Sequence, residues 1–258
     1  MIKMEKPKTR IAIVGYGNVG KGVYEAAQRN PDMELAGIIS RRPEKIILDV
    51  PGAHVYAPDN FERLEADVAI LCGGSKNDLP EQGPNYARFF NTVDSFDTHA
   101  NIPEYFKQMD EIARQNLHVA VISAGWDPGT FSLERVLGDA FIPDSEKYTF
   151  WGPGVSQGHS DAIRQVEGVA DAIQYTIPIE DALTSVRLGK NPSLTTRQKH
   201  WRDCYVALKE GADSEQVRQA ITNMPNYFAD YDTKVTFETT EQIAERKKQM
   251  PHGGFVMT

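Results

Sequence analysis

The chain is organised around residues 10–22, which read RIAIVGYGNVGKG. A short apolar run ends there in the pattern G-x-G-x-x-G and leads into residues 22–29, which can form a helix. A strand, a glycine-rich turn and a helix in this order are typical of a dinucleotide-binding unit. The stretch therefore predicts a Rossmann-type α/β domain with a parallel sheet.

Each glycine of the pattern has its own physical role. Gly15 permits the tight turn, Gly17 lacks the Cβ that would block a pyrophosphate, and Gly20 lets the helix pack closely on the strand. The N-terminus of that helix offers free N–H groups and the positive end of a dipole to the phosphates. We expect cofactor contacts from Gly15, Tyr16, Gly17, Asn18, Val19 and Gly20.

The same residues also fit all but the last position of the P-loop pattern G-x-x-x-x-G-K-[ST]. Gly22 stands where that motif needs a hydroxyl for Mg²⁺. A nucleoside triphosphatase is therefore disfavoured, and Lys21 is more simply an exposed helix residue.

Composition limits the class of protein. The 258 residues can form two domains, and 40% hydrophobic with 25% charged residues is ordinary for a globular protein. The net charge of −8 argues against a nucleic-acid partner, which needs clustered Lys and Arg. No apolar run could span a membrane, so we expect a cytoplasmic protein. Cys72 and Cys204 suit packing, and the scattered histidines predict no metal site.

The residues after the second predicted strand, 34–39, indicate which cofactor binds. In this fold an acid about 20 positions beyond the glycines bonds the ribose 2′-OH of NAD, whereas an arginine accommodates the 2′-phosphate of NADP. Ser40, Arg41 and Arg42 stand at that distance, and no acid does. A guanidinium can pair bidentately with phosphate, so we predict NADP. The alternative for Arg41 is an exposed loop residue without a ligand.

Further strands and helices complete the predicted first domain. Residues 67–72, 91–94 and 119–122 are expected to form strands, and residues 80–90 and 102–116 helices. Ligands of open α/β sheets bind at the carboxyl ends of the strands. Further cofactor contacts are therefore expected after residues 67–72, from Cys72, Gly73, Gly74 and Ser75.

The character of the sequence changes near residue 125. Residues 150–161 look like a glycine-rich, aromatic and polar loop. Residues 171–177, 205–209 and 233–237 predict strands, and residues 214–223 a helix. We expect a dinucleotide-binding domain at 1–125 and an α+β substrate and dimerisation domain at 126–258.

Three polar clusters are candidates for the chemistry. The first contains Asp97 and the second contains Asp127, each just after a predicted strand. A carboxylate there can face a nicotinamide, although Asp127 could instead cap a helix that starts at Pro128. The third cluster consists of Gln157, Gly158, Thr176, Arg202 and His252. A buried arginine needs an acidic partner or an anionic ligand, but the sequence alone does not bring this third cluster together.

Seven separated motifs resemble the meso-diaminopimelate dehydrogenase family over essentially the whole chain. They are VGYGNVGKG, SRRP, VDSFDTH, SAGWDPG, FWGPGVSQGHSDA, QYTIP and MPHGG. The resemblance implies a homodimeric bacterial enzyme of lysine biosynthesis. Such an enzyme oxidatively deaminates the D-centre of meso-2,6-diaminopimelate with NADP, giving L-2-amino-6-oxopimelate and ammonia.

The resemblance also assigns roles to residues. It implies that the reacting D-centre is surrounded by Asp97, Trp126, Asp127, Trp151, Gln157 and Gly158. It implies that the distal L-centre and its carboxylate are held by Thr176, Arg202 and His252, and that Arg41 and Arg42 meet the 2′-phosphate. A carboxylate that orients or deprotonates the amine suits hydride departure, which needs a neutral amine. Whether Asp97, Asp127 or water takes the proton stays open.

One departure from the family and two alternatives remain. The sequence stops soon after MPHGG, where the family usually continues, so we expect a truncated substrate domain that lacks an asparagine near the distal carboxylate. A semialdehyde dehydrogenase is the alternative enzyme, but Cys72 and Cys204 lack the context of a thiol nucleophile. A nucleotide-sensing regulatory protein is the non-catalytic alternative, and it would need neither paired carboxylates nor a cationic clamp.

Overall fold

The computed structural model describes residues 7–61, 63–249 and 251–258. The predicted first domain begins with residues 1–6, which lie outside the described residues, as does Met250 of the MPHGG motif. The chain divides into two compact units, Met1–Leu133 and Glu134–Thr258, with the boundary inside a helix. Each unit is described by itself.

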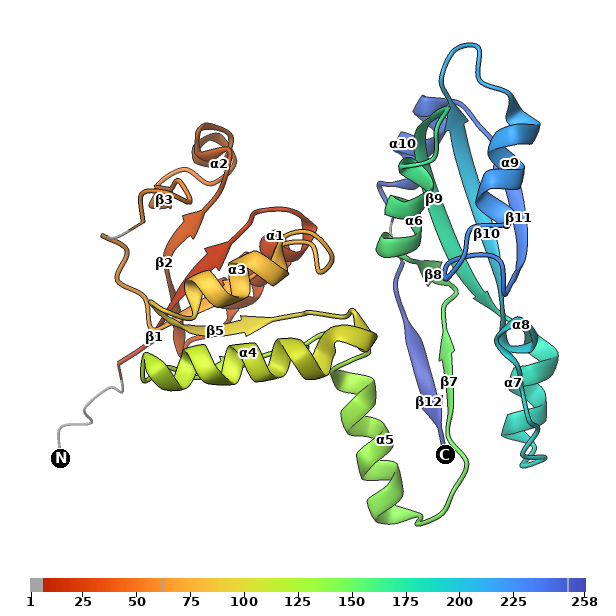
Figure 1. Ribbon diagram of the computed structural model, residues 1–258, viewed down its shortest axis with the longest axis horizontal. Coiled ribbons are helices and arrows are strands. Elements are labelled where there is room, and N and C mark those ends of the chain that lie inside the picture. The colour runs from red at the N-terminus through yellow and green to blue at the C-terminus, as the bar shows by residue number, and fades with distance from the viewer. Residues whose placement is uncertain (1–6, 62, 250) are drawn as a thin grey trace. The chain divides into compact units, whose positions relative to one another are not determined.

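The first unit is built on a six-stranded sheet in the order β3-β2-β1-β4-β5-β6, in which all neighbours run parallel (Figure 1). This is the strand order of dinucleotide-binding folds, and it confirms the predicted fold class. The strands are β1 (Thr9–Val14), β2 (Met33–Ile39), β3 (Val55–Tyr56), β4 (Val68–Leu71), β5 (Asn91–Asp94) and β6 (Ala120–Val121).

Helices cover both faces of this sheet. They are α1 (Asn18–Arg29), α2 (Pro43–Asp49), α3 (Leu79–Tyr86) and α4 (Ile102–Gln115), with the 3₁₀ turn η1 (His99–Asn101) before α4. Helix α5 (Thr130–Phe141) follows β6 and contains the boundary between the two units. Successive side chains of a strand point to opposite faces, so β1 contributes to two cores. Ala12 and Val14 pack with Tyr105 and Met109 of α4, whereas Ile11 and Ile13 belong to a separate core.

The second unit contains a four-stranded sheet in the order β11-β10-β9-β8 and a two-stranded sheet, β12-β7. Strand β9 is antiparallel to both neighbours, and β10 is parallel to β11. The strands are β7 (Tyr148–Trp151), β8 (Gly154–Val155), β9 (Val169–Pro178), β10 (His200–Leu208), β11 (Asp232–Phe237) and β12 (Gly254–Met257). The helices are α6 (Gln157–Arg164), α7 (Glu180–Arg187), α8 (Thr196–Lys199), α9 (Ser214–Thr222) and α10 (Thr240–Arg246).

Two expectations about local structure are corrected. Residues 150–161 are not a loop, because they contain the end of β7, all of β8 and the first turns of α6. The sequence did not predict these elements, because glycine, present at 152, 154 and 158, disfavours the interior of helices and strands. Strand β10 begins at His200 rather than at residue 205, because polar side chains fill the early strand positions that propensity alone would reject.

Candidate functional site

The glycine turn after β1 has the geometry expected of a dinucleotide loop. Gly15 has φ of +90°, which favours glycine, and its N–H donates to the Ile39 carbonyl at 2.9 Å. A Cβ on Gly20 would lie 2.1 Å from the Gly15 carbonyl oxygen, whereas a Cβ on Gly17 would meet no protein atom within 4 Å. Gly20 therefore serves helix packing, and Gly17 leaves room for a close ligand.

Helix α1 presents an uncapped N-terminus at this turn. Its N-cap is Gly17, no side chain caps it, and its first turn, which starts with Asn18 and Val19, contains no acid. The first N–H groups of a helix have no partner within the helix, so they can donate to an anion. Tyr16 packs edge-on against Tyr24 of α1. The residues present thus fit the pyrophosphate of a dinucleotide.

The predicted 2′-phosphate residues follow β2. Arg41 Nη1 lies 3.4 Å from Asp78 Oδ1, and Asp78 Oδ2 accepts the Gly74 N–H at 2.8 Å. Ser40 Oγ accepts the Arg42 N–H at 3.1 Å. Asp78 therefore links the arginine loop after β2 to the Gly73-Gly74 loop after β4, a connection that sequence spacing did not reveal.

Cys72 follows the last residue of β4 and precedes that glycine loop. Its N–H donates to the Val14 carbonyl at 2.8 Å, which places Gly73 and Gly74 beside the Gly15 turn. Burial raises the pKa of the Cys72 thiol to about 12 and that of Cys204 still further. Both thiols therefore stay protonated, which argues against a thiolate nucleophile.

The two candidate catalytic carboxylates belong to the first unit. The Asp97 N–H donates to Ser75 Oγ at 2.8 Å, so the segments after β5 and β4 are joined. Asp127 lies in a turn closed by the Thr130 N–H, which donates to the Gly125 carbonyl at 3.0 Å. Helix α5 begins at Thr130 rather than at Pro128, so Asp127 lies three residues before the first residue of the helix. Trp126 packs edge-on against Phe131, at 5.5 Å between ring centroids.

In the second unit the structure brings Arg202 and Thr176 together. Antiparallel pairing sets them opposite each other on β10 and β9, and Arg202 Nη1 donates to Thr176 Oγ1. Arg202 is 5% exposed, and its Nε has no hydrogen-bond partner. Among the described residues, Arg202 forms no ion pair with a carboxylate, whereas the exposed Arg197 pairs with Asp232. A buried cation without an acidic partner is costly unless an anion joins it.

The surroundings of Arg202 are aromatic and uncharged. The guanidinium carbon lies 3.7 Å from the centroid of the Tyr231 ring. Burial, with the nearby Arg202 charge as second cause, lowers the pKa of His159 to about 3 and that of His200 to about 4. Both imidazoles are therefore neutral near pH 7 and add no competing charge.

Trp151 and His252 form a second pair in the same unit. Their rings stack at 6.2 Å between centroids with an interplanar angle of 13°. The Trp151 N–H donates to His200 Nε2 at 2.8 Å, so His200 ties the two-stranded sheet to the start of β10. The Gly152 N–H donates to the Gly253 carbonyl at 2.8 Å, which holds the His252 loop beside β7.

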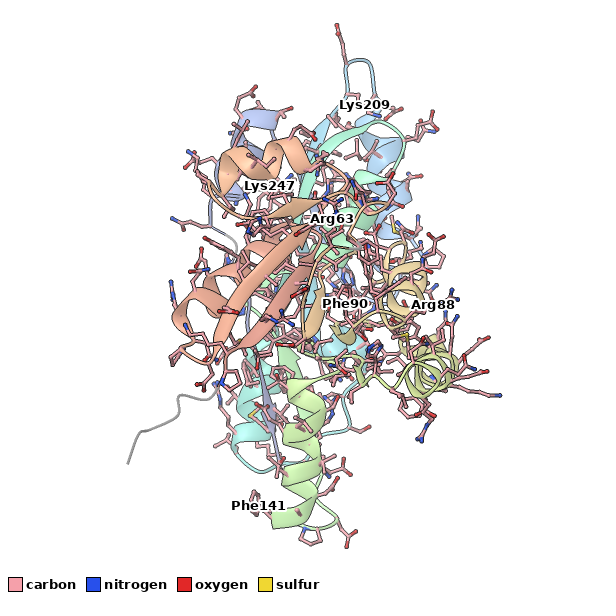
Figure 2. All side chains as sticks on the ribbon, turned by 90° about the vertical axis from the view of Figure 1, so that its left-hand side faces the viewer. Arg63, Arg88, Phe90, Phe141, Lys209 and Lys247 are labelled. Atoms are coloured by element: carbon pink, nitrogen blue, oxygen red, sulfur yellow. The ribbon has the colours of Figure 1, made fainter. Side chains whose placement is uncertain are left out.

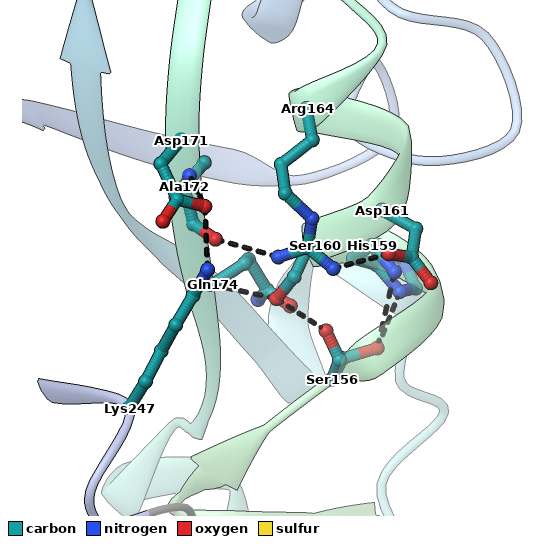
Figure 3. A network of polar contacts seen from close by, with 9 residues as sticks. All are labelled: Ser156, His159, Ser160, Asp161, Arg164, Asp171, Ala172, Gln174 and Lys247. Carbon is teal, nitrogen blue, oxygen red and sulfur yellow. Dashed lines mark hydrogen bonds and ion pairs between the residues drawn. The ribbon is translucent and has the colours of Figure 1, made fainter. Parts of the chain in front are cut away.

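Gln157 and Gly158 open α6, which hydrogen bonds anchor to β9. Figure 3 shows Ser160 Oγ donating to the Ser156 carbonyl and accepting the Gln174 N–H, at 2.6 Å and 3.0 Å. Gln174 Nε2 in turn lies 3.4 Å from Thr176 Oγ1. The first turn of α6 and the Thr176–Arg202 pair are thus linked through buried polar groups.

Several residues of this region escaped the sequence reasoning. Tyr231 approaches Arg202 only through the fold, and no local pattern could have indicated it. His159 and Ser156 lie inside the motif FWGPGVSQGHSDA, where Ser156 Oγ caps α6 and contacts His159 Nδ1 at 2.7 Å. The available signal was the serine itself, because serine is a preferred N-cap and could have indicated that a helix begins after Ser156, close to His159.

Neither a membrane-spanning helix nor a metal-binding cluster occurs in the described residues. No helix there is long and apolar enough to cross a membrane. No group of three or more His, Cys, Asp or Glu side chains within that part of the chain could hold a metal ion.

The Rossmann-type sheet, the glycine turn and the arginine loop define a dinucleotide-binding α/β protein. A family model described as the diaminopimelic acid dehydrogenase C-terminal domain matches residues 125–258. The chain is 55% identical to the meso-diaminopimelate D-dehydrogenase of Lysinibacillus sphaericus, over 96% of this chain and 77% of that protein. It belongs to the meso-diaminopimelate D-dehydrogenase family.

Solved structures agree with this family. A meso-diaminopimelate dehydrogenase mutant from Clostridium tetani, crystallised with DAP, matches with a TM-score of 0.89 and 50% identity, over 96% of this chain and 77% of that one. An engineered D-amino acid dehydrogenase bound to NADP⁺ matches with a TM-score of 0.85 and 41% identity, over the same shares of the two chains.

Proposed function

We propose that this protein catalyses the NADP-dependent, reversible oxidative deamination of meso-2,6-diaminopimelate at its D-centre, in lysine biosynthesis. The reaction consumes meso-2,6-diaminopimelate, water and NADP⁺ and gives L-2-amino-6-oxopimelate, ammonium, NADPH and one proton. The family membership supports the activity, and the buried, unpaired Arg202 is the observation that carries the choice of substrate. A substrate with a second carboxylate supplies the anion that Arg202 lacks.

The cofactor proposal rests on the arginine loop and on a relative. The engineered D-amino acid dehydrogenase binds NADP⁺, and Arg41 with Arg42 gives this chain cations where an NAD-binding domain has an acid. When bound, NADP supplies the acceptor for the hydride. The pyrophosphate would be held by residues 15–20 and the ribose phosphate by residues 40–42, with residues 72–75 beside them.

We assign the reacting centre to the carboxylates of Asp97 and Asp127, with Trp126, Trp151, Gln157 and Gly158 as substrate contacts. A carboxylate that accepts a hydrogen bond from the substrate ammonium orients it and can take its proton. Both aspartates belong to segments that follow parallel strands, β5 and β6, and the carboxyl ends of such strands are where this fold binds its ligands, which supports the assignment.

We assign the distal L-centre to Thr176, Arg202 and His252. An arginine–carboxylate pair that is shielded from water is directional and strong. The substitutions of the Clostridium tetani mutant independently support the assignment of these three residues. Its substitutions include a glutamine, a threonine, an arginine, a proline and a histidine, in the same order and at the same spacings as Gln157, Thr176, Arg202, Pro251 and His252.

We further propose that the active form is a homodimer. Helix α5 exposes a row of large apolar side chains at helical spacing, of which Phe141 is labelled in Figure 2. They are Leu133, Val136, Leu137 and Phe141, with exposed fractions of 67%, 64%, 53% and 78%. A second copy of the same face is an occupant that would bury this row.

The substitution Arg202→Met tests the substrate assignment. Losing one partner of a buried charged pair costs on the order of 2–5 kcal/mol, so kcat/KM for meso-diaminopimelate should fall sharply. Activity on an apolar D-amino acid such as D-leucine should be spared or improved, because such a substrate has no second carboxylate that needs a cation at position 202. Steady-state NADP reduction with both substrates measures the change.

Arg197→Met is the matched control. Arg197 lies in the same unit but is 52% exposed and already pairs with Asp232, so its loss should not alter selectivity. If Arg202→Met loses equal activity on both substrates, with an unchanged circular dichroism spectrum, Arg202 does not hold the distal carboxylate.

A further inference from the structure

A buried carboxylate ends strand β5 in the first unit. Asp94 is the last residue of β5 and is 2% exposed, yet no ion pair satisfies it among the residues that the structure describes. A buried carboxylate needs several hydrogen-bond donors in place of water. Asp94 lies in the motif VDSFDTH, but the proposed reaction assigns it no role.

Three donors reach this side chain from three segments. Asp94 Oδ1 accepts the N–H of Phe96 at 2.9 Å and the N–H of Ser123 at 3.1 Å. Asp94 Oδ2 accepts the hydroxyl of Tyr105 of α4 at 2.7 Å. The main chain adds a fourth bond, because the Ala124 N–H donates to the Asp94 carbonyl at 2.7 Å.

These bonds join the two segments that carry the candidate catalytic carboxylates. Phe96 immediately precedes Asp97, and Ser123 lies at the start of the segment that leads to Asp127. A single oxygen, Asp94 Oδ1, therefore fixes the main chain of both. Ser123 has φ of +59°, a conformation that non-glycine residues rarely adopt, so its orientation depends on such external bonds.

The third donor, the Tyr105 hydroxyl, holds the Asp94 carboxylate in place. The Tyr105 and Phe96 rings stack at 4.2 Å between centroids, within the core that α4 forms with the sheet. Burial, with the Asp94 charge as a second cause, raises the pKa of Tyr105 far above its usual value, so the hydroxyl stays a donor at every working pH. The Tyr105 hydroxyl therefore holds Asp94 Oδ2 as a hydrogen-bond donor.

We infer that Asp94 is the positioning residue that sets the separation and orientation of Asp97 and Asp127 for the reaction. This inference rests on the proposed function, because it concerns the same two carboxylates. Misplacing a reacting group by about 1 Å costs on the order of 100-fold in rate. Asp94 acts through the main chain and touches no substrate.

Two substitutions separate geometry from charge. Asp94→Asn removes the charge but keeps an oxygen for both N–H groups and an amide N–H₂ group that can donate to the Tyr105 hydroxyl. Asp94→Glu keeps the charge but moves the oxygens by one methylene. If Asp94 positions the segments, Asp94→Asn retains most of kcat, whereas Asp94→Glu loses on the order of 100-fold. Both should bind NADP as the unaltered protein does.

The measurements are kcat and KM for meso-diaminopimelate, the Kd for NADP and the melting temperature. Ile11→Ala is the control for lost stability, since Ile11 is buried in the opposite core of the same unit. The inference is overturned if Asp94→Glu keeps its kcat, if Asp94→Asn loses as much as Asp94→Glu, or if Ile11→Ala with an equal loss of melting temperature loses equal kcat.

A second readout does not depend on catalysis. Amide hydrogen exchange over residues 95–97 and 123–127 should be faster in Asp94→Glu than in Asp94→Asn or Ile11→Ala. Equal exchange in all three variants would overturn the positioning role. A protein that shows this exchange pattern but does not reduce NADP with meso-diaminopimelate would contradict the proposed function and leave Asp94 as the anchor of the two segments.

Discussion

At the scale of single residues, the two arginines assigned to substrate and cofactor differ in their surroundings. Arg202 is buried without a carboxylate, whereas Arg41 is 78% exposed and pairs with Asp78 at 3.4 Å. A buried guanidinium such as that of Arg202 would form a strong, directional pair with the second carboxylate of the proposed substrate. The exposed guanidinium of Arg41 is accessible to a phosphate but subject to screening by salt.

Arg41→Ala should weaken NADP binding far more than NAD binding. The lost charged hydrogen bonds are each worth about 1.5–3 kcal/mol, and NAD has no 2′-phosphate to lose them. Calorimetric titration of both cofactors at two salt concentrations measures the effect, and the NADP advantage should shrink at high salt.

Arg29→Ala is the control, because Arg29 is an exposed arginine at the opposite end of α1 that pairs with Glu25. The phosphate assignment fails if Arg41→Ala weakens NAD and NADP equally.

The residue scale also shows where sequence reasoning ends. The type and spacing of Ser40, Arg41 and Arg42 allow a prediction of NADP from the sequence alone, because the position of the ribose relative to the glycine turn is a regular feature of this fold. Thr176 and Arg202 were candidates from the sequence, but only the family resemblance grouped them at one centre, since the register of two antiparallel strands is a property of the fold. Tyr231 and Asp78, which contact the two arginines, had no local signal.

At the scale of elements, His200 joins two sheets of the second unit and makes that junction sensitive to acid. Its Nε2 accepts the Trp151 N–H, which requires a neutral ring. The folded state lowers the pKa of His200 from 6.5 to about 4, so between these values the unfolded chain binds more protons. The free energy of unfolding should therefore fall as pH drops through this window, by up to about 1.4 kcal/mol per unit.

His200→Gln should flatten this dependence, because glutamine can still accept the N–H through its amide oxygen and does not titrate. Urea unfolding at several pH values between 7 and 5 measures the slope in both proteins. His159, with a pKa lowered to about 3, contributes in the same direction and remains in both. Identical slopes would show that His200 is not the residue responsible.

The exposed row on α5 predicts how the chain assembles. Sedimentation equilibrium should give a dimer, and Val136→Lys should shift the population towards monomer by placing a charge in the apolar row. Leu188→Lys is the control, since Leu188 is 65% exposed at the end of α7 and belongs to no such row. A monomer at all concentrations, or a dimer untouched by Val136→Lys, would contradict the proposed interface.

Elements of the first unit followed from the sequence more closely than those of the second. Apolar runs such as residues 11–14 and 68–71 form parallel strands because both faces of the sheet are covered. In the second unit, strands such as β10 carry alternating polar residues, and one of them, Arg202, points into the structure rather than out. Propensity reads these positions as loop, because it contains no information about burial.

At the scale of the whole molecule, the glycine pattern of residues 15–20 predicts the fold of the first unit, and family membership supports the proposed activity of the chain. The central claim is that the protein oxidises a D-configured amino centre while holding a distal L-centre. The most direct test compares NADP reduction with the meso, L,L and D,D isomers of diaminopimelate. We expect rapid reduction with the meso isomer, none with L,L, and a much slower reaction with D,D. Equal rates with the meso and L,L isomers, or no reduction with meso-diaminopimelate, would contradict the account.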